Sequence, residues 1–399
     1  MTWADVPPDS DFPVENLPVG VVRVAGHPRV ATRIGDHVLP IGDVVADPMF
    51  ERATANDFLA SGPSRWAEVR DRLHGWLTEP ANARPLDSVH EVQVLLPVAI
   101  GDFVDFYSSI HHATRVGELF RPGAEPLLPN WRHLPIGYHG RAGTIVSSGT
   151  DIPRPHGLLP TEGGVWRGPS ARLDFEAEVG FVVGTGNERG RPVPPGEADR
   201  HVFGVVLVND WSARDIQAFE YQPLGPFLGK SFATTISQWI VPLAALAPFR
   251  TSPPVQDPSP DASLTDPGDG AIAIRVEASV GDTTLCRADL RDLYWTFAQQ
   301  YAHLTSNGAS TRTGDLFATG TVSGPGANAM GCLLESTRGG VEPVSLDDGS
   351  TRTWLEDGDV VTLRGWAGGR SADDPDHVRI GFGEATGRIV PGDTDGGPR

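Results

Sequence analysis

The stretch Phe203-Gly204-Val205-Val206-Leu207-Val208-Asn209-Asp210 is an apolar run that ends in two polar residues. A continuous run of this length, rich in β-branched side chains, predicts a strand buried on both faces. Asp210 stands at its end, where a rigid element holds a side chain in a fixed position. The stretch therefore predicts a β-rich core with a functional carboxylate at the end of a strand.

The rest of the chain favours many short strands over long helices. Its 399 residues include 47 glycines and 36 prolines, so turns are frequent. Besides residues 203–208, strand patterns occur at residues 19–24, 30–34, 37–41, 92–100, 271–276, 358–363 and 377–382. Helical patterns occur at residues 67–77 and 290–303, and residues 251–269 read as an exposed loop rich in Pro, Asp and Ser. We expect a smaller unit over residues 1–97, a larger one over 98–399, and a disordered tail after Pro391.

Composition excludes several classes of protein. The net charge of −19 would repel nucleic acid and anionic membranes. No apolar run reaches the roughly 18 residues that span a bilayer, and the first residues lack the pattern of a secretory signal. Cys286 and Cys332 have no redox or metal-binding spacing, so we expect reduced core thiols. The sequence predicts a cytoplasmic protein.

Carboxylates cluster in the segment Leu173-Asp174-Phe175-Glu176-Ala177-Glu178-Val179. Strand alternation places Asp174, Glu176 and Glu178 on one face, where they repel one another unless solvent or a cation compensates. A solvated outer face is one reading. The other adds Asp105 and Asp210 and predicts an oxygen-ligated Ca²⁺ or Mg²⁺ site, not a zinc or copper site. Asp174 is left as a residue that supports the ligands.

Histidines and arginines add groups suited to catalysis on an acidic substrate. His111 and His112 are adjacent, so only one is expected to face a pocket, and histidine is the natural base near neutral pH. Arg121 offers a bidentate fork for a carboxylate, and Tyr138 lies in a polar Tyr-His-Gly-Arg run.

Lys230 is the single lysine among 32 lysine and arginine residues. It follows a Gly/Pro-rich loop that can approach a site closely. Lysine is a compact point charge, whereas arginine is a broad planar fork. A short helical turn after Asp210 would bring Arg214 and Gln217 together at i,i+3. The density of polar residues around Lys230 favours a site over a chance survivor.

Four stretches together resemble the fumarylacetoacetase family. They are residues 105–112 (Asp-Phe-Tyr-Ser-Ser-Ile-His-His), 134–141 (Leu-Pro-Ile-Gly-Tyr-His-Gly-Arg), 209–217 (Asn-Asp-Trp-Ser-Ala-Arg-Asp-Ile-Gln) and 223–232 (Pro-Leu-Gly-Pro-Phe-Leu-Gly-Lys-Ser-Phe). The likeness runs along nearly the whole chain and includes the N-terminal unit.

The resemblance implies a mainly β fold, with an SH3-like N-terminal barrel, a C-terminal mixed β-sandwich roll, and assembly as a homodimer. It implies Ca²⁺ and/or Mg²⁺ as cofactor, with a first position held by Asp105, Glu176, Glu178 and Asp210. A second Mg²⁺ position would use Asp210, the Lys230 backbone and Thr234. It assigns His112, not His111, as the base and Glu335 as its orienting partner, and it gives substrate contacts to Tyr107, Arg121, Tyr138, Gln217, Tyr221 and Thr321.

The implied activity is hydrolysis of the carbon–carbon bond of a small β-diketone dicarboxylate, fumarylacetoacetate, the last step of tyrosine and phenylalanine breakdown. Arg214, Gln217 and Lys230 would stabilise developing negative charge. One alternative is a related reaction at the same metal site, such as acylpyruvate hydrolysis, oxaloacetate decarboxylation or hydration. Another is a non-catalytic binding protein that the metal stabilises.

Overall fold

The computed structural model describes residues 2–369 and 378–392, and the chain is mainly β, as expected. The N-terminal part forms an antiparallel sheet in the order β4-β3-β2-β1-β5. Its strands are β1 (Val19–Val24), β2 (His27–Ile34), β3 (His37–Pro40), β4 (Asp87–Ser88) and β5 (Gln93–Leu95). Helix α2 (Pro63–Thr78) packs its buried Val69, Leu73 and Leu77 into the same core. The strand expected over residues 92–100 is shorter, because Pro97 has no N–H for a ladder.

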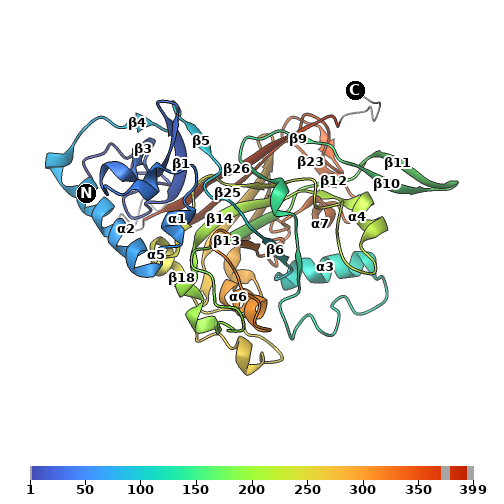
Figure 1. Cartoon of the computed structure of the whole chain (residues 1–399). Helices are drawn as coiled ribbons and strands as arrows, with labels where there is room; N and C mark the ends of the chain where they lie inside the picture. The colour runs from blue at the N-terminus through green and yellow to red at the C-terminus, as the bar shows by residue number, and fades with distance from the viewer. Residues whose placement is uncertain (1, 370–377, 393–399) are drawn as a thin grey trace.

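A second, eight-stranded sheet forms the centre of the molecule (Figure 1). Its order is β7 (Gly137–His139), β6 (Phe103–Phe106), β22 (Leu316–Ala318), β13 (Ala177–Val183), β14 (Val202–Asp210), β16 (Thr234–Ile236) and β8 (Ile145–Ser147), with β17 (Val241–Pro242) also paired to β14. The sheet is mixed, since β6–β22 and β8–β16 are parallel and the other pairs are antiparallel. The change from β5 to β6 falls between Leu95 and Phe103; the division at residues 97 and 98 stays a prediction.

Strand β14 is buried along its whole length, as its sequence predicts. Val206 and Val208 face one core, which they share with the N-terminal sheet. Val205 and Leu207 face another core, which they share with a third sheet. Residues 202–208 of the strand are apolar because both of its faces are covered.

The third sheet has the order β21-β20-β25-β26-β9 and packs against the central one. Its strands are β21 (Thr283–Asp289), β20 (Ile274–Val280), β25 (Val360–Ala367), β26 (Ile380–Val390) and β9 (Ile152–Pro153). The expected strand over residues 271–276 is interrupted, because β19 (Ala271–Ile272) pairs with β18 (Arg250–Thr251) instead. Residue 377 of the expected strand 377–382 and the tail from residue 393 lie outside the described residues.

Short helices surround the sheets: α3 (Ile110–Phe120), α4 (Arg214–Glu220), α6 (Phe297–Thr305) and α7 (Leu333–Ser336). The helix expected over residues 290–303 is wrong as one element. A 3₁₀ turn ends at Asp292, and Thr296 starts α6 anew through a capping box with Gln299. The loop 251–269 is mostly exposed, as expected, although Leu264 is buried.

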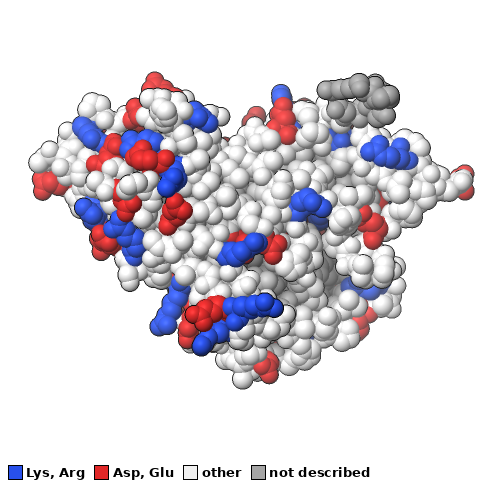
Figure 2. Space-filling view, in the orientation of Figure 1, with Lys and Arg blue, Asp and Glu red and all other residues white. Residues whose placement is uncertain are grey.

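The surface carries charges of both signs. In Figure 2, arginines and acidic residues are interspersed over the N-terminal unit, and much of the remaining face is uncharged. The hairpin of β10 (His156–Thr161) and β11 (Gly164–Pro169) extends away from the body (Figure 1). In the described part of the chain, no helix is long and apolar enough to cross a membrane.

Candidate active site

Four buried carboxylates meet at one end of the central sheet. They come from β6 (Asp105), the start of β13 (Glu176 and Glu178) and the end of β14 (Asp210), and their ligand oxygens lie within 4.8 Å of one another. Strand alternation explains the meeting. Asp105 shares its sheet face with Phe103, as Asp210 does with Val208, and these apolar residues pack into the core of the N-terminal unit.

The alternative of a solvated outer face for the acidic segment is wrong, because Asp174, Glu176 and Glu178 are all buried. The segment is also not one strand: β12 (Leu173–Asp174) pairs with β15 (Ser212–Ala213), and β13 begins only at Ala177. Asp174 is not one of the four clustered carboxylates and forms an ion pair with Arg214.

Two cations balance part of this charge. Lys230 Nζ lies 2.5 Å from Glu176 Oε2 and 2.7 Å from Asp210 Oδ2. Arg214 Nη2 lies 2.7 Å from Glu176 Oε1. Burial alone would raise the pKa of Glu176, but Lys230 and Arg214 outweigh it and lower that pKa. Glu176 is therefore a carboxylate at neutral pH.

Asp105 and Glu178 lack such compensation. Asp105 Oδ1 and both carboxylate oxygens of Glu178 are buried and accept no hydrogen bond from the described residues. Burial and the neighbouring carboxylates raise the pKa of both groups well above its ordinary value. Buried oxygens without partners, aimed at one point among four carboxylates, fit a hard divalent cation.

Asp210 has further partners on the side of Lys230. The Thr234 hydroxyl donates to Asp210 Oδ1 (3.0 Å), since Asp210 and Thr234 are paired across β14 and β16. The Tyr138 hydroxyl donates to Asp210 Oδ2 (3.2 Å). The predicted second group of Asp210, Lys230 and Thr234 is thus adjacent in space.

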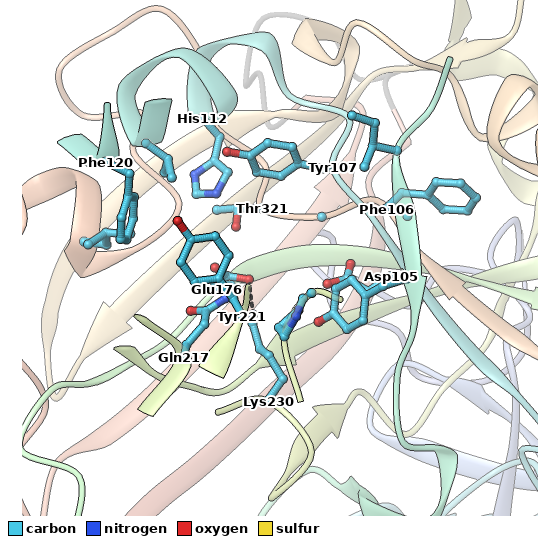
Figure 3. A pocket seen from close by; sticks show the side chains of 18 of the residues that line it. Asp105, Phe106, Tyr107, His112, Phe120, Glu176, Gln217, Tyr221, Lys230 and Thr321 are labelled. Atoms are coloured by element: carbon cyan, nitrogen blue, oxygen red, sulfur yellow. Dashed lines mark hydrogen bonds and ion pairs between the residues drawn. The ribbon is translucent and has the colours of Figure 1, made fainter. Parts of the chain in front are cut away.

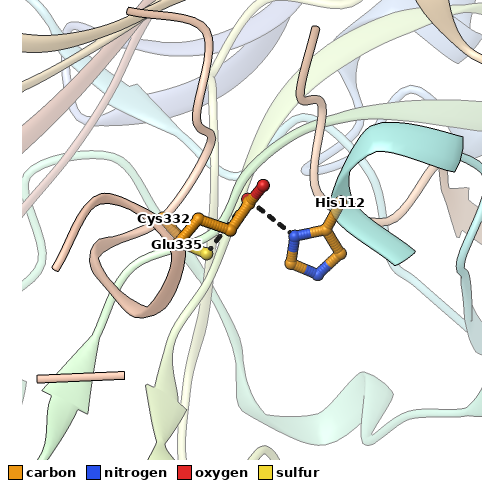
Figure 4. Close-up of side chains that lie close together, drawn as sticks. All are labelled: His112, Cys332 and Glu335. Atoms are coloured by element: carbon orange, nitrogen blue, oxygen red, sulfur yellow. Dashed lines mark hydrogen bonds and ion pairs between the residues drawn. The ribbon is translucent and has the colours of Figure 1, made fainter. Parts of the chain in front are cut away.

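A histidine–glutamate pair lies beside the carboxylates. His112 Nδ1 is 2.7 Å from Glu335 Oε2, and both side chains are buried (Figure 4). His112 projects from α3, where the Ser109 hydroxyl caps the helix by accepting from the His112 amide. Although burial would raise the pKa of Glu335, the His112, Ser323 and Arg115 side chains lower it to about 2. Glu335 is therefore an ionised acceptor that fixes the His112 ring.

A cavity of about 420 Å³ is lined by His112 and by two of the carboxylates, Asp105 and Glu176, whereas Glu178, Asp210 and Glu335 are not among its lining residues. In Figure 3, His112 and Tyr107 lie on one side, Lys230 on the opposite side, and Glu176 between them. Its lining includes the predicted residues Asp105, Tyr107, His112, Arg121, Tyr138, Glu176, Arg214, Gln217, Tyr221, Lys230 and Thr321. Arg214 Nη1 donates to Gln217 Oε1 (3.2 Å), as the i,i+3 spacing on α4 predicts. His111 does not line the cavity.

Sequence reasoning missed several contributors. Arg115 Nη1 lies 3.1 Å from Glu335 Oε1, and the Ser323 hydroxyl donates to Glu335 Oε2 (2.7 Å). Leu224, Phe120 and Val116 supply apolar lining. Arg115 stands at i+3 from His112 on α3, a spacing that places the two on one side of a helix; Ser323 has no such signal.

Together, a carboxylate cluster suited to a hard cation and an oriented histidine open onto one cavity. These features define a metal-dependent hydrolytic enzyme on a mixed β fold.

Known proteins identify the family. The family model "Fumarylacetoacetate (FAA) hydrolase C-terminal" matches residues 103–390, and "Fumarylacetoacetase N-terminal" matches residues 15–102. The chain is 43% identical to fumarylacetoacetase of Bos taurus (98% of this chain, 99% of the relative) and 44% identical to that of Arabidopsis thaliana (98% of each). The human fumarylacetoacetase is 42% identical, over 98% of this chain and 99% of its own. The chain belongs to the fumarylacetoacetate hydrolase family.

Solved structures share the fold. A fumarylacetoacetate hydrolase from Exiguobacterium antarcticum aligns with a TM-score of 0.55 at 17% identity, covering 94% of this chain and 99% of that one. A maleylpyruvate hydrolase from Sphingobium aligns with a TM-score of 0.52 at 16% identity, covering 94% and 100%.

Proposed function

We propose that this protein is a fumarylacetoacetase, which hydrolyses 4-fumarylacetoacetate to fumarate and acetoacetate in the last step of tyrosine and phenylalanine breakdown. The supporting observation is that one cavity is lined by His112, which Glu335 holds, and by Asp105 and Glu176 of the four-carboxylate cluster. Fumarylacetoacetases of animals and plants are 41–44% identical over 98% of the chain.

His112 is the proposed general base. Its Nδ1 is held by Glu335, so Nε2 is left to remove a proton from water. The resulting hydroxide adds to the carbonyl carbon, the carbon–carbon bond breaks, and the departing carbon leaves as the enolate of acetoacetate. A proton from the imidazolium or from water then completes acetoacetate.

The carboxylates of Asp105, Glu176, Glu178 and Asp210 would hold the cation. A bound Ca²⁺ or Mg²⁺ supplies Lewis acidity toward the diketone oxygens. The identity of the ion is part of the proposal. A second Mg²⁺, held by Asp210, Thr234 and the Lys230 backbone, is also part of it. The uncompensated oxygens of Asp105 and Glu178 support the first position.

Fixed donors face the place where negative charge develops. The carboxylates of Asp210 and Glu176 raise the pKa of Lys230 against the effect of burial, so its ammonium stays charged. Lys230, Arg214 and Gln217 would stabilise the enolate. Tyr107, Arg121, Tyr138, Tyr221 and Thr321 are the proposed contacts to the rest of the dicarboxylate, because all five line the cavity.

The proposal extends to assembly and location. A homodimer is supported by the family resemblance and by apolar side chains such as Leu158, Val165 and Trp166, which are exposed on the projecting hairpin. A cytoplasmic location is part of the proposal and rests on the family resemblance.

The test is a substrate panel followed through loss of the diketone absorbance, using enzyme loaded with Mg²⁺ or Ca²⁺. Fumarylacetoacetate should turn over at least tenfold faster, in kcat/KM, than an acylpyruvate or oxaloacetate. Preference for either of the latter would replace the proposed substrate, and no turnover at all would favour a binding protein.

The His112→Ala variant tests the base. Loss of a general base should lower kcat by about 10²- to 10⁴-fold, with cation binding unchanged by calorimetry. His111→Ala is the matched control, because His111 lies outside the cavity. A folded, metal-loaded His112→Ala enzyme with unimpaired turnover would refute the assignment.

A further inference from the structure

Asp174 is fully buried and saturated with hydrogen bonds, yet it takes no part in the chemistry described above. Its Oδ1 accepts from the backbone N–H groups of Phe175 (2.8 Å) and Leu333 (2.7 Å). Its Oδ2 accepts from the Leu334 N–H (3.0 Å) and from Arg214 Nε (2.8 Å), and lies 2.8 Å from Arg214 Nη2. Four hydrogen-bond donors thus converge on one carboxylate, and Arg214 Nη2 adds an ion-pair contact.

The first connection leads to the His112–Glu335 pair. Leu333 and Leu334 open α7, and Glu335 is the next residue of that helix. A helix of four residues has little stability of its own, so its orientation depends on what holds its ends. Asp174 binds the unpaired N–H groups at its start and thereby fixes the point from which Glu335 reaches His112.

The second connection leads to the carboxylate cluster. The guanidinium of Arg214 that binds Asp174 also lies 2.7 Å from Glu176 Oε1 and reaches Gln217 through Nη1. Because the guanidinium is rigid and planar, the position of Asp174 also determines where Arg214 meets Glu176 and Gln217.

We propose that Asp174 is a positioning residue that couples the two halves of the site, holding α7 and Arg214 in register so that the base and the cation ligands face the same substrate atoms. This role rests on the proposed function for its kinetic consequence, but its structural consequence is independent of the substrate.

The Asp174→Asn variant tests the coupling at constant side-chain size. An amide has one accepting oxygen and one donating NH₂, so either orientation turns a donor toward Leu333 and Phe175 or toward Leu334 and Arg214. Either the His112–Glu335 pair or the Arg214 guanidinium should then shift. We expect kcat for fumarylacetoacetate to fall about 10²-fold, the effect of a displacement of about 1 Å, with KM changed by less than about threefold.

A spectroscopic readout separates positioning from general destabilisation. The short His112 Nδ1–H···Glu335 bond should give a downfield proton resonance in the metal-loaded enzyme, assigned by its loss in Glu335→Gln. In Asp174→Asn this resonance should shift or broaden, and the kinetic effects of Asp174→Asn and Glu335→Gln should be less than additive.

The matched control is Asp289→Asn. Asp289 also caps a short helical turn, by accepting from the Arg291 N–H (3.0 Å), but it touches neither α7 nor Arg214. This variant should keep the resonance and its kcat within about twofold.

An unchanged resonance in folded Asp174→Asn, or a kcat no lower than that of the control, would overturn the proposal. If Asp174→Asn does not fold, Arg214→Lys takes its place. A lysine has no planar fork that can bridge Asp174 and Glu176, so the His112 resonance should again shift. An unchanged resonance in Arg214→Lys would overturn the coupling. If the wild-type enzyme does not turn over fumarylacetoacetate, the proposed function fails while the resonance still decides the role of Asp174.

Discussion

At the scale of single residues, the one lysine of the chain is buried between two carboxylates of the site. Lys230 is 6% exposed, and its ammonium lies between two carboxylates that are proposed to hold the cation. A point charge at 2.5 and 2.7 Å from two oxygens fits there, whereas a planar guanidinium would push Glu176 and Asp210 apart.

Lys230→Arg should therefore lower kcat by about 10²-fold or more and weaken cation binding measured by calorimetry. Lys230→Met separates shape from charge: it should also lose turnover, but with cation affinity kept or increased, because a positive charge beside the ligands is removed. A Lys230→Arg enzyme with wild-type turnover and affinity would mean that lysine survives there by accident.

The sequence predicts many of the residues of the cavity, because the motif residues are contiguous and their types suit one chemistry. It does not predict their partners. Asp174 meets Leu333 across 159 positions, and Ser323 and Arg115 reach Glu335 from different elements. Such pairings depend on how the strands and loops return to the site, which local spacing does not encode.

At the scale of elements, strand periodicity predicts more than helix periodicity does. The apolar run at residues 203–208 correctly predicts a strand buried on both faces, since Val206 and Val208 enter one core and Val205 and Leu207 another. The repeat at residues 290–303 fails because the 3₁₀ turn capped by Asp289 ends at Asp292 and Thr296 caps a new helix. Hydrophobic spacing alone cannot distinguish one helix from two short ones that share a buried side.

The turn after β22 depends on glycine. Gly320 has φ +75°, and an added Cβ would lie 2.1 Å from the Phe106 carbonyl oxygen. Gly320→Ala should lower the free energy of unfolding by about 2 kcal/mol or more, from strain and overlap together. Because Thr321 follows and lines the cavity, KM should also rise several-fold.

Chemical denaturation and steady-state kinetics measure the two effects of Gly320→Ala. Gly143→Ala serves as the control, since a Cβ there meets no atom within 4 Å; its stability should stay within about 1 kcal/mol of wild type. A Gly320→Ala protein as stable as this control would show that the turn can relax.

At the scale of the whole molecule, the site is where folding and function oppose each other. The central sheet buries four carboxylates beside two apolar cores, and among the described residues Lys230 and Arg214 are the cations that form ion pairs with this cluster. Asp105 and Glu178 have pKa values raised by burial and by their neighbours. At pH values between the ordinary carboxyl pKa of about 4 and the raised pKa, Asp105 and Glu178 stay protonated in the folded chain but lose their protons in the unfolded chain. Stability of the metal-free protein must therefore fall as pH rises through that window.

Removing the cation with a chelator should thus lower Tm more at pH 8 than at pH 5.5, by calorimetry or circular dichroism. Adding Ca²⁺ or Mg²⁺ should restore Tm, because a bound cation favours the ionised carboxylates. In Glu178→Gln, one of the two titrating groups is neutral at every pH, so the metal-free protein should lose much of this dependence. A chelator effect equal at both pH values would contradict the account. Glu176, whose pKa is lowered, contributes its pH dependence only below its ordinary pKa and does not enter this window.

The burial of the only lysine also has a practical consequence for handling the protein. Reagents that modify primary amines find no accessible ε-amino group, because Lys230 is enclosed and held as an ion pair. Acylation near neutral pH should therefore leave Lys230 unmodified, so that amine-directed dyes or surface linkers spare the active site.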